Sequence, residues 1–344
     1  MFKIFKKYLK FNIFLSLLLV FTLFFTFNSV FANDRKYVIP GGDAIGLKIN
    51  TGVYVIGKYN VPTKTSKLSP WKSSDILEGD KIVRVNNQTV NNVESLMKII
   101  NNSQDEYCNL LIKRNNENIN TKIDIVTSTN GEKTIGLYLK DKLLGIGTLT
   151  FIDPDTNRFA SLGHGITDKT LSYGKINGCI VTSNIEGIKK GIPGTSGEKR
   201  ASISSIELGK IISNNNTGVY GKVTKPLSRK AIPVANQLEV HKGSAIMLTV
   251  IDGDKIESFD IEIIGINLQD STGTKGLKVK IVDEDLIKYA GGIVQGMSGS
   301  PIIQDEKLVG AISHVSVSEP TIGYGMHIGW MIEEINRIWR LQQV

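Results

Sequence analysis

Hydrophobic and polar residues alternate in short segments along most of the chain after residue 35, and glycine-containing turns separate these segments. Residues 53–57, 107–113 and 145–152 show the pattern clearly. Alternation is typical of a strand with one buried face, because successive side chains of a strand point to opposite sides of the sheet. Many such segments in succession predict a mostly β fold of the sandwich or barrel kind.

One segment has helical periodicity instead. Its apolar residues recur at intervals of three and four, namely Val93, Leu96, Met97 and Ile100. This spacing predicts a helix over residues 93–100, because these side chains would share one face. Asn91 or Asn92 would cap it, since an Asn side chain accepts hydrogen bonds from the first free amides of a helix.

The first 32 residues have the organisation of an export signal. A basic start is followed by an apolar run over residues 11–27 and then by Val30-Phe31-Ala32, a small-x-small cleavage motif. The run is long for a signal peptide and just long enough to span a bilayer, so a cleaved signal and a retained membrane anchor both fit. Either one predicts that everything after Asn33 lies on the extracytoplasmic side of a membrane.

Composition favours a globular protein without a nucleic-acid partner. The chain has 344 residues, 22% of them charged and 41% hydrophobic, which is enough for two domains. Half of the formal charge of +8 comes from four lysines that precede the apolar run, so the remainder is only mildly basic.

Cys108 and Cys179 are expected to be small buried residues and not a disulfide framework. No Cys, His and carboxylate cluster has the spacing of a metal site, so we expect neither metal nor cofactor.

Residues 35–120 resemble a PDZ domain. The resemblance rests on LEGDKIVRVN at residues 77–86, which the predicted helix and a final strand follow. PDZ domains bind a peptide as an added strand and hold its terminal carboxylate with the amides of a glycine-rich loop. By this resemblance the peptide-binding loop would contain Gly41, Gly42, Ile45 and Gly46. A packing module that binds no free peptide end is the alternative.

A second candidate site lies near the C-terminal end, in the sequence GMSGSP at residues 296–301. Small residues around Ser298 allow a tight turn, and the amides of Gly296 and Ser298 would form an oxyanion hole for a carbonyl that the serine attacks. An ordinary turn between two strands is the plain alternative. A strand, a polar turn and a second strand follow over residues 301–313. This arrangement resembles chymotrypsin-type serine peptidases, except that Ser300 replaces a glycine.

A serine nucleophile needs a base, and the base needs an orienting partner. His164 is the strongest candidate for the base, because glycines flank it at the end of an apolar segment. His241 is expected at the surface, His314 in the substrate cleft and His327 in a structural position. Spacing alone does not choose the acid. The acids between His164 and Ser298 include Asp252, Asp254, Asp260, Asp270, Asp283, Glu284 and Asp285.

Several motifs together resemble the stage IV sporulation protein B peptidases of spore-forming bacteria. They are GIGTLTF at residues 145–151, LGHGITD at residues 162–168 and GGIVQGMSGSPIIQ at residues 291–304. The resemblance implies a trypsin-like double β-barrel domain over residues 125–344, with a catalytic triad of His164, Asp283 and Ser298. Asp285, two residues away and on the same face of an expected strand, is the alternative acid.

The resemblance further implies a signalling protease that is made in the developing spore and sent across its inner membrane. It would cleave itself near its N-terminus and then cut a membrane-associated protein between the forespore and mother cell membranes, which triggers transcription-factor processing. Its expected partners are therefore a protein substrate and the chain itself. Two other functions stay open. One is a catalytically silent scaffold that binds membrane-protein tails through the PDZ-like unit, and the other is an envelope quality-control protease.

Overall fold

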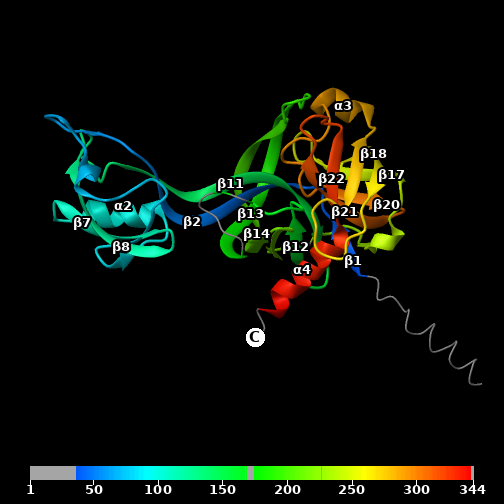
Figure 1. Cartoon of the computed structure of the whole chain (residues 1–344), viewed down its shortest axis with the longest axis horizontal. Coiled ribbons are helices and arrows are strands. Elements are labelled where there is room, and N and C mark those ends of the chain that lie inside the picture. Colours follow the sequence, from blue (N-terminus) through cyan, green and yellow to red (C-terminus); the bar gives the residue numbers. More distant parts are fainter. Residues whose placement is uncertain (1–35, 167, 169–173, 226, 342–344) are drawn as a thin grey trace, which may run out of the picture. The chain divides into compact units, whose positions relative to one another are not determined.

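The computed structural model describes residues 36–166, 168, 174–225 and 227–341 (Figure 1). Strands dominate these residues, so the predicted mostly β fold is confirmed. The predicted export segment at residues 1–32 lies outside the described residues. Within the described part, no helix is long and apolar enough to cross a membrane.

A first hydrophobic core is built from residues between Val53 and Leu137, and we call the body around it the first lobe. Its elements are the outer part of β2 (Ala44–Lys58), β3 (Val61–Pro62), β4 (Lys67–Leu68), a 3-10 turn (Pro70–Ser73), β5 (Lys81–Val85), β6 (Gln88–Thr89), α2 (Val93–Asn102), β7 (Tyr107–Arg114), β8 (Glu117–Asp124), β9 (Val126–Thr127), β10 (Lys133–Thr134) and the start of β11 (Leu137–Ile152).

Helix α2 forms where the sequence predicts it. Leu96 and Ile100 are buried in the core of the first lobe. Asn92 caps the helix: its side chain accepts a hydrogen bond from the amide of Ser95, and Ser95 Oγ accepts one from the amide of Asn92. Two amides at the helix start are satisfied in this reciprocal way.

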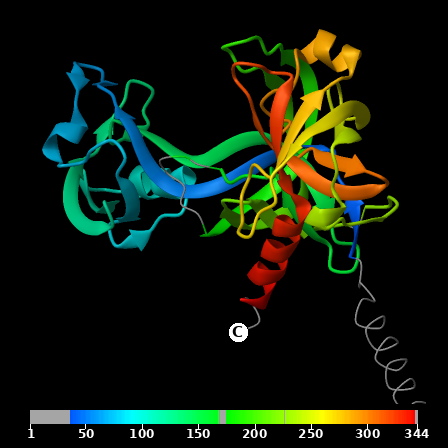
Figure 2. The same cartoon turned by 45° about the vertical axis from the view of Figure 1, so that its right-hand side comes forward.

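The first lobe is inserted between two strands of the second body. β2 and β11 pair antiparallel from Lys58 opposite Leu137 to Ala44 opposite Thr148, and Figures 1 and 2 show them running side by side. The inner parts of both strands belong to a separate core that contains Leu47 and Leu149. The structure therefore divides the chain differently from the expected domains at 35–120 and 125–344.

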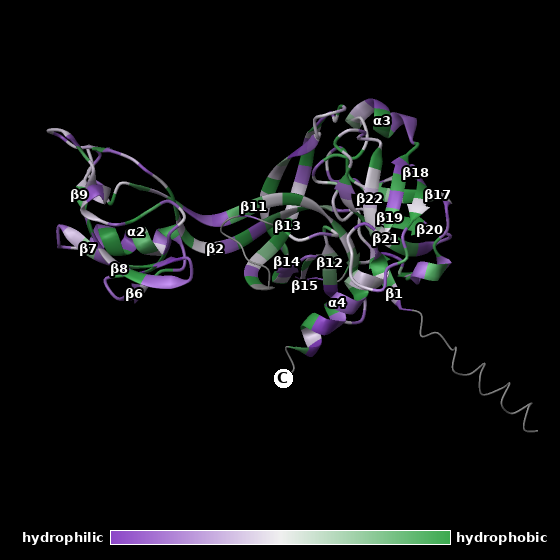
Figure 3. Cartoon of the chain, viewed as in Figure 1, coloured by the Kyte–Doolittle hydropathy of each residue, from purple (hydrophilic) through white to green (hydrophobic). Residues whose placement is uncertain are grey.

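Six strands of the second body close into a ring. In order they are β11, β12 (Arg158–Ser161), β15 (Gly218–Val223), β14 (Glu198–Asn215), β13 (Gly174–Lys189) and β2, and the pairing of β11 with β2 closes the ring. β1 (Tyr37–Pro40) pairs with β11, and β16 (Ile232–Pro233) pairs with β1. The hydropathy colouring of Figure 3 shows the alternation of apolar and polar residues along these strands.

A second set of strands forms a closed barrel. In order they are β17 (Gly243–Thr249), β18 (Glu257–Ile266), β19 (Leu277–Ile281), β22 (Ile322–His327), β21 (Lys307–Val315) and β20 (Pro301–Gln304). The hairpin of β20 and β21 confirms the predicted strand, turn and strand over residues 301–313. Asp305 and Glu306 both have positive φ in its two-residue turn, as a tight hairpin requires.

Two helices and a 3-10 turn (Gln237–Glu239) complete the second body. Helix α4 (Ile328–Arg340) buries Met331 and Ile335 in a core shared with Phe151 of β11. Helix α3 (Glu284–Ala290) follows β19 directly, with Asp283 as its N-cap and Gly291 in the left-handed conformation at its end. The expectation that residues 283–285 lie on a strand is therefore wrong, because the Asp283 side chain accepts the amide of Leu286 and starts a helix there.

Candidate active site

The turn that carries Ser298 fits tightly against β11. Gly296 and Gly299 both have φ of +94°, a conformation that side chains other than glycine rarely adopt. A Cβ atom on Gly299 would lie 2.1 Å from the carbonyl oxygen of Thr148 and 2.4 Å from the amide nitrogen of Leu162. Glycine is thus required at position 299 both for backbone conformation and for space.

Two buried threonines of β11 fix this turn. The amide of Thr148 donates to the carbonyl of Ser298 at 2.9 Å, and its hydroxyl donates to the carbonyl of Gly296 at 2.8 Å. The hydroxyl of Thr150 donates to the carbonyl of Gly299 at 2.9 Å. Neither threonine is predicted from the sequence to be part of the site. Their signal was two hydroxyl side chains in succession on one face of a strand whose residues are otherwise apolar.

The predicted oxyanion donors are available. Among the residues that the structure describes, the amides of Gly296 and Ser298 donate no hydrogen bond, whereas the amides of Met297, Gly299 and Ser300 all do. Gly296 and Ser298 are partly exposed and line the pocket, so their amides are free to donate to an acceptor that enters it. This is the arrangement that stabilises a developing oxyanion.

His164 lies in the turn after β12, where Leu162 and Gly163 both have positive φ. Its Nδ1 is 2.9 Å from the carbonyl oxygen of Gly165. A carbonyl only accepts hydrogen bonds, so a neutral imidazole carries its proton on Nδ1, and Nε2 is left as a base. The ring is half-buried, and no hydrogen bond joins it to Ser298 within the described part of the chain.

Asn214 holds the residues that follow His164. It is fully buried on β14, its Oδ1 accepts the amide of Ile166 at 2.8 Å, and its Nδ2 donates to the carbonyl of Ile166 at 3.0 Å. These two bonds satisfy both the backbone N–H and the backbone C=O of Ile166. Asn214 was not predicted, because nothing in the sequence distinguishes it from Asn215 and Asn216, which follow it directly.

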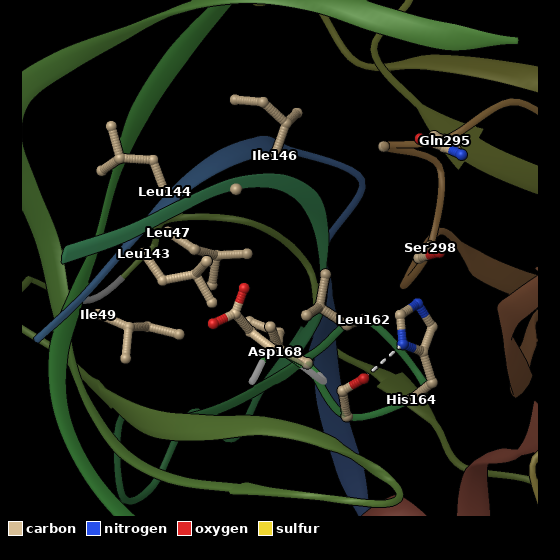
Figure 4. Close-up of a pocket in the computed structure, with 14 residues that line it drawn as sticks. Leu47, Ile49, Leu143, Leu144, Ile146, Leu162, His164, Asp168, Gln295 and Ser298 are labelled. Atoms are coloured by element: carbon tan, nitrogen blue, oxygen red, sulfur yellow. Dashed lines mark hydrogen bonds between the residues drawn. The ribbon is translucent and has the colours of Figure 1, made fainter. Parts of the chain in front are cut away.

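One pocket of about 560 Å³ brings the predicted residues together. Ser298, Gly296 and His164 all line it, and Figure 4 shows Ser298 and His164 near one another on one side. The other lining residues are Leu47, Ile49, Leu143, Leu144, Gly145, Ile146, Leu162, Gly165, Ile166, Asp168 and Gln295. The predicted nucleophile, base and oxyanion donors thus meet at one cavity.

The structure does not bring Asp283 to this pocket. Its Oδ1 accepts the amide of Leu286 at 2.8 Å, and its Oδ2 lies 3.4 Å from the amide of Asp260. Asp285 is exposed in the first turn of α3. The described acid that lines the pocket is Asp168, and it lies 3.6 Å from Lys140 Nζ. In this geometry the carbonyl of Gly165, and not a carboxylate, orients the His164 ring.

His241 and His327 have the surroundings that the sequence predicts, whereas His314 lies near His164 but does not line the pocket. His241 is exposed and pairs with Asp305. His327 is buried, and its Nε2 lies 3.1 Å from the carbonyl oxygen of Asn267. The rings of His314 and His164 have centroids 5.5 Å apart. Burial lowers the pKa of His314, and the charges of His164 and Lys275 lower it further.

A buried lysine lies beneath the turn that carries Ser298. Lys199 of β14 is only 6% exposed, its Nζ donates to Thr249 Oγ1 at 2.8 Å, and its aliphatic part packs against Gly296. Burial lowers the pKa of Lys199 to about 7.

Cys108 is buried as expected, which raises its pKa to about 12, whereas Cys179 is only partly buried. The described residues hold no group of three or more His, Cys, Asp and Glu that could bind a metal ion.

The expected peptide-binding loop needs correction. The amides of Gly41 and Gly42 donate to the carbonyls of Thr150 and Leu149, each at 2.9 Å. Ile45 and Gly46 belong to β2 and pair with β13 and β11. These residues are part of the second body and not of the first lobe. Because the amides of Gly41 and Gly42 are already bonded, they offer no site for a terminal carboxylate.

Comparison with known proteins finds one matching protein family and two similar solved structures. A family model described as SpoIVB peptidase S55 matches residues 131–332. Among solved structures, an inactive serine-to-alanine mutant of Rv3671c from M. tuberculosis has 12% identity and a TM-score of 0.33, covering 58% of this chain and 84% of that one. The active form of the same protease has 11% identity and a TM-score of 0.33, covering 57% and 74%. The curated proteins give no match.

The matched region contains the residues of β11 that line the pocket, and it also contains the turns of His164 and Ser298. It spans more than half of the chain. The chain therefore belongs to the SpoIVB peptidase S55 family and is a serine peptidase.

Proposed function

We propose that Ser298 is the nucleophile and His164 the general base of this peptidase. Ser298 Oγ attacks the carbonyl carbon of the scissile peptide bond while its proton passes to Nε2 of His164. The imidazolium then gives this proton to the leaving amine, and water hydrolyses the acyl-enzyme by the reverse path. The two turns share one pocket, and the bond from Nδ1 to the carbonyl of Gly165 favours the tautomer that this step needs.

The amides of Gly296 and Ser298 supply the oxyanion hole in this proposal. Both donors are fixed before substrate binds, because Thr148 and Thr150 hold the carbonyls of the same turn. Donors that need no rearrangement stabilise the developing charge most effectively. The pair of unpartnered amides beside Ser298 is the single observation that best supports the roles given to these residues.

The physiological role is an intercompartmental signalling protease of spore formation. In this proposal the peptidase cleaves itself near its N-terminus and then cuts a membrane-associated protein on the extracytoplasmic side, between the forespore and mother cell membranes. Membership of the SpoIVB family supports sporulation, and the export pattern of residues 1–32 supports the compartment.

Mass spectrometry of the N-terminus tests this function. Wild-type protein is expected to lose an N-terminal segment on incubation, whereas Ser298→Ala keeps it. Ser300→Ala serves as the matched control, because Ser300 lies in the same turn with a buried hydroxyl that has no partner among the described residues. This control should be processed like wild type. Complete self-processing of Ser298→Ala would contradict the proposed role of Ser298.

A further inference from the structure

The pocket extends well beyond the two catalytic turns. From Ser298 and His164 it continues over aliphatic side chains of β2 and β11, and Figure 4 shows Leu144 and Ile146 on one side of β11 and the other labelled aliphatic residues of these strands on its other side. Leu47 and Ile49 of β2 form its buried floor, and Leu143 of β11 is partly buried against the same core. At about 560 Å³, the pocket falls within the range of roughly 300–1,000 Å³ that is typical of ligand sites.

The rim of the pocket is also apolar. Leu144 lines it and is 58% exposed, and Ile146 and Ile166 line it as partly buried residues. The charged group in the lining is Asp168, which already lies 3.6 Å from Lys140. An acidic substrate side chain would lose its hydration in such a pocket and face the carboxylate of Asp168, and a basic one would have to compete with Lys140 for that carboxylate, whereas an apolar one would gain by burial.

We infer that this wall is a specificity subsite, which selects peptide substrates with a bulky aliphatic or aromatic side chain close to the scissile bond. The inference rests on the proposed catalytic roles of Ser298 and His164, because the subsite is continuous with the cavity that they line. Leu143 and Leu144 are its specificity-determining residues. Neither takes part in the proton transfers or in the oxyanion hole.

Leu144 offers the sharper test, because it is exposed and its replacement leaves the core intact. Leu144→Asp places a carboxylate at the rim, where it opposes an apolar side chain and attracts a basic one. A matched control is Ile206→Asp, since Ile206 is 65% exposed on β14 and does not line the pocket. Leu143→Ala enlarges the pocket and should move the preference from leucine towards phenylalanine and tryptophan.

The experiment uses the purified full chain and a mixture of unstructured peptides that vary at the positions flanking the cleaved bond, with products read by mass spectrometry. Wild type should prefer a bulky apolar residue at one of these positions. Leu144→Asp should lower the leucine-to-lysine ratio of kcat/KM about 10-fold or more, the size of effect expected from one apolar contact and one new charge. Ile206→Asp should leave this ratio unchanged. A ratio of rates does not depend on the amount of folded enzyme.

Three results overturn the inference. Cleavage that depends on Ser298 but shows no preference for bulky apolar residues rejects the subsite and leaves the proposed function standing. The same conclusion follows if Leu144→Asp and Ile206→Asp have equal leucine-to-lysine ratios. If neither the peptides nor the chain itself is cut in a Ser298-dependent way, the proposed function fails, and the subsite fails with it.

Discussion

At the scale of single residues, the groups that would perform the chemistry are held by buried polar side chains. Thr148 and Thr150 fix the turn of Ser298, and Asn214 fixes the turn of His164. The sequence predicts Ser298 and His164 because their glycine-rich surroundings are local. It does not predict their supports, because Asn214 lies 48 residues from its partner Ile166, and Thr148 lies 148 residues from Gly296.

Replacing Asn214 tests whether the His164 turn must be held in place. Asn214→Ala removes both hydrogen bonds to the backbone N–H and C=O of Ile166. Each is worth about 1 kcal/mol, so loss of both should lower kcat by roughly 30-fold if the histidine is displaced from its working position. The exposed neighbour Asn216→Ala is the control and should have wild-type kcat. An unchanged kcat in Asn214→Ala would show that the turn holds its shape without these bonds.

Burial of Lys199 predicts a pH-dependent stability. Its pKa is about 7 in the folded protein but near 10.4 in the unfolded chain, so between these values the unfolded state binds more protons. Stability therefore rises with pH across this window, and the buried lysine is most costly at pH 7 and below. Lys199→Met removes this cost, at most a few kcal/mol, and loses one hydrogen bond.

The free energy of unfolding, measured in denaturant at several pH values, checks this prediction. The stability of Lys199→Met relative to wild type should be greatest near pH 6 to 7 and should fall steadily towards pH 10. The exposed Lys280→Met provides the reference, and its difference from wild type should vary little over the same range. A constant difference for Lys199→Met at every pH would mean that Lys199 stays charged in the folded protein.

At the scale of secondary-structure elements, the sequence succeeds where the pattern is local. Helix α2 and the hairpin of β20 and β21 are predicted because spacing, capping and turn residues lie within a few positions. Helix α3 is missed because its seven residues follow β19 after only two others, so residues 283–285 are predicted as a continuation of that strand. The side chain of Asp283 caps the helix and so ends the extended conformation, and the spacing of apolar residues gives no sign of such a cap.

Asp283→Asn separates a helix cap from a triad acid. Asn is about as good an N-cap as Asp, so the geometry predicts nearly unchanged stability and a kcat within about 10-fold of wild type. The family resemblance implies instead a loss of roughly 10⁴-fold, because the base would hold the wrong tautomer. Peptidase assays of Asp283→Asn and Asp285→Asn side by side decide between the two. A loss near 10⁴-fold in a folded Asp283→Asn protein would contradict the cap-only role.

At the scale of the whole molecule, the sequence predicts a mostly β chain with two bodies but misplaces the junction between them. The reason is that β2 and β11 are 15 and 16 residues long and each passes from one core to the other as a single strand. Their pairing partners are about ninety residues apart, as Asn50 is opposite Lys142. Only the pairing shows that Gly41, Gly42, Ile45 and Gly46 belong with the peptidase strands.

This arrangement predicts which deletions the fold tolerates. Because Asn50 and Lys142 are opposite one another, replacing residues 51–141 with a short Asn-Gly turn should preserve the six-stranded ring. Deleting residues 37–125 removes β1 and β2 and should abolish it. Circular dichroism and thermal unfolding provide the comparison. A cooperative transition is expected for the first deletion alone, and a cooperative transition in the second would contradict the insertion of the first lobe.

Covalent labelling with a fluorophosphonate tests the central claim most directly. An activated serine attacks the phosphorus and displaces fluoride, and mass spectrometry of the digested protein locates the adduct. The account predicts labelling of Ser298 in wild type and in Ser300→Ala, no label at this turn in Ser298→Ala, and labelling slowed by orders of magnitude in His164→Ala. A label on another residue, no label at all, or an unchanged rate in His164→Ala would contradict it.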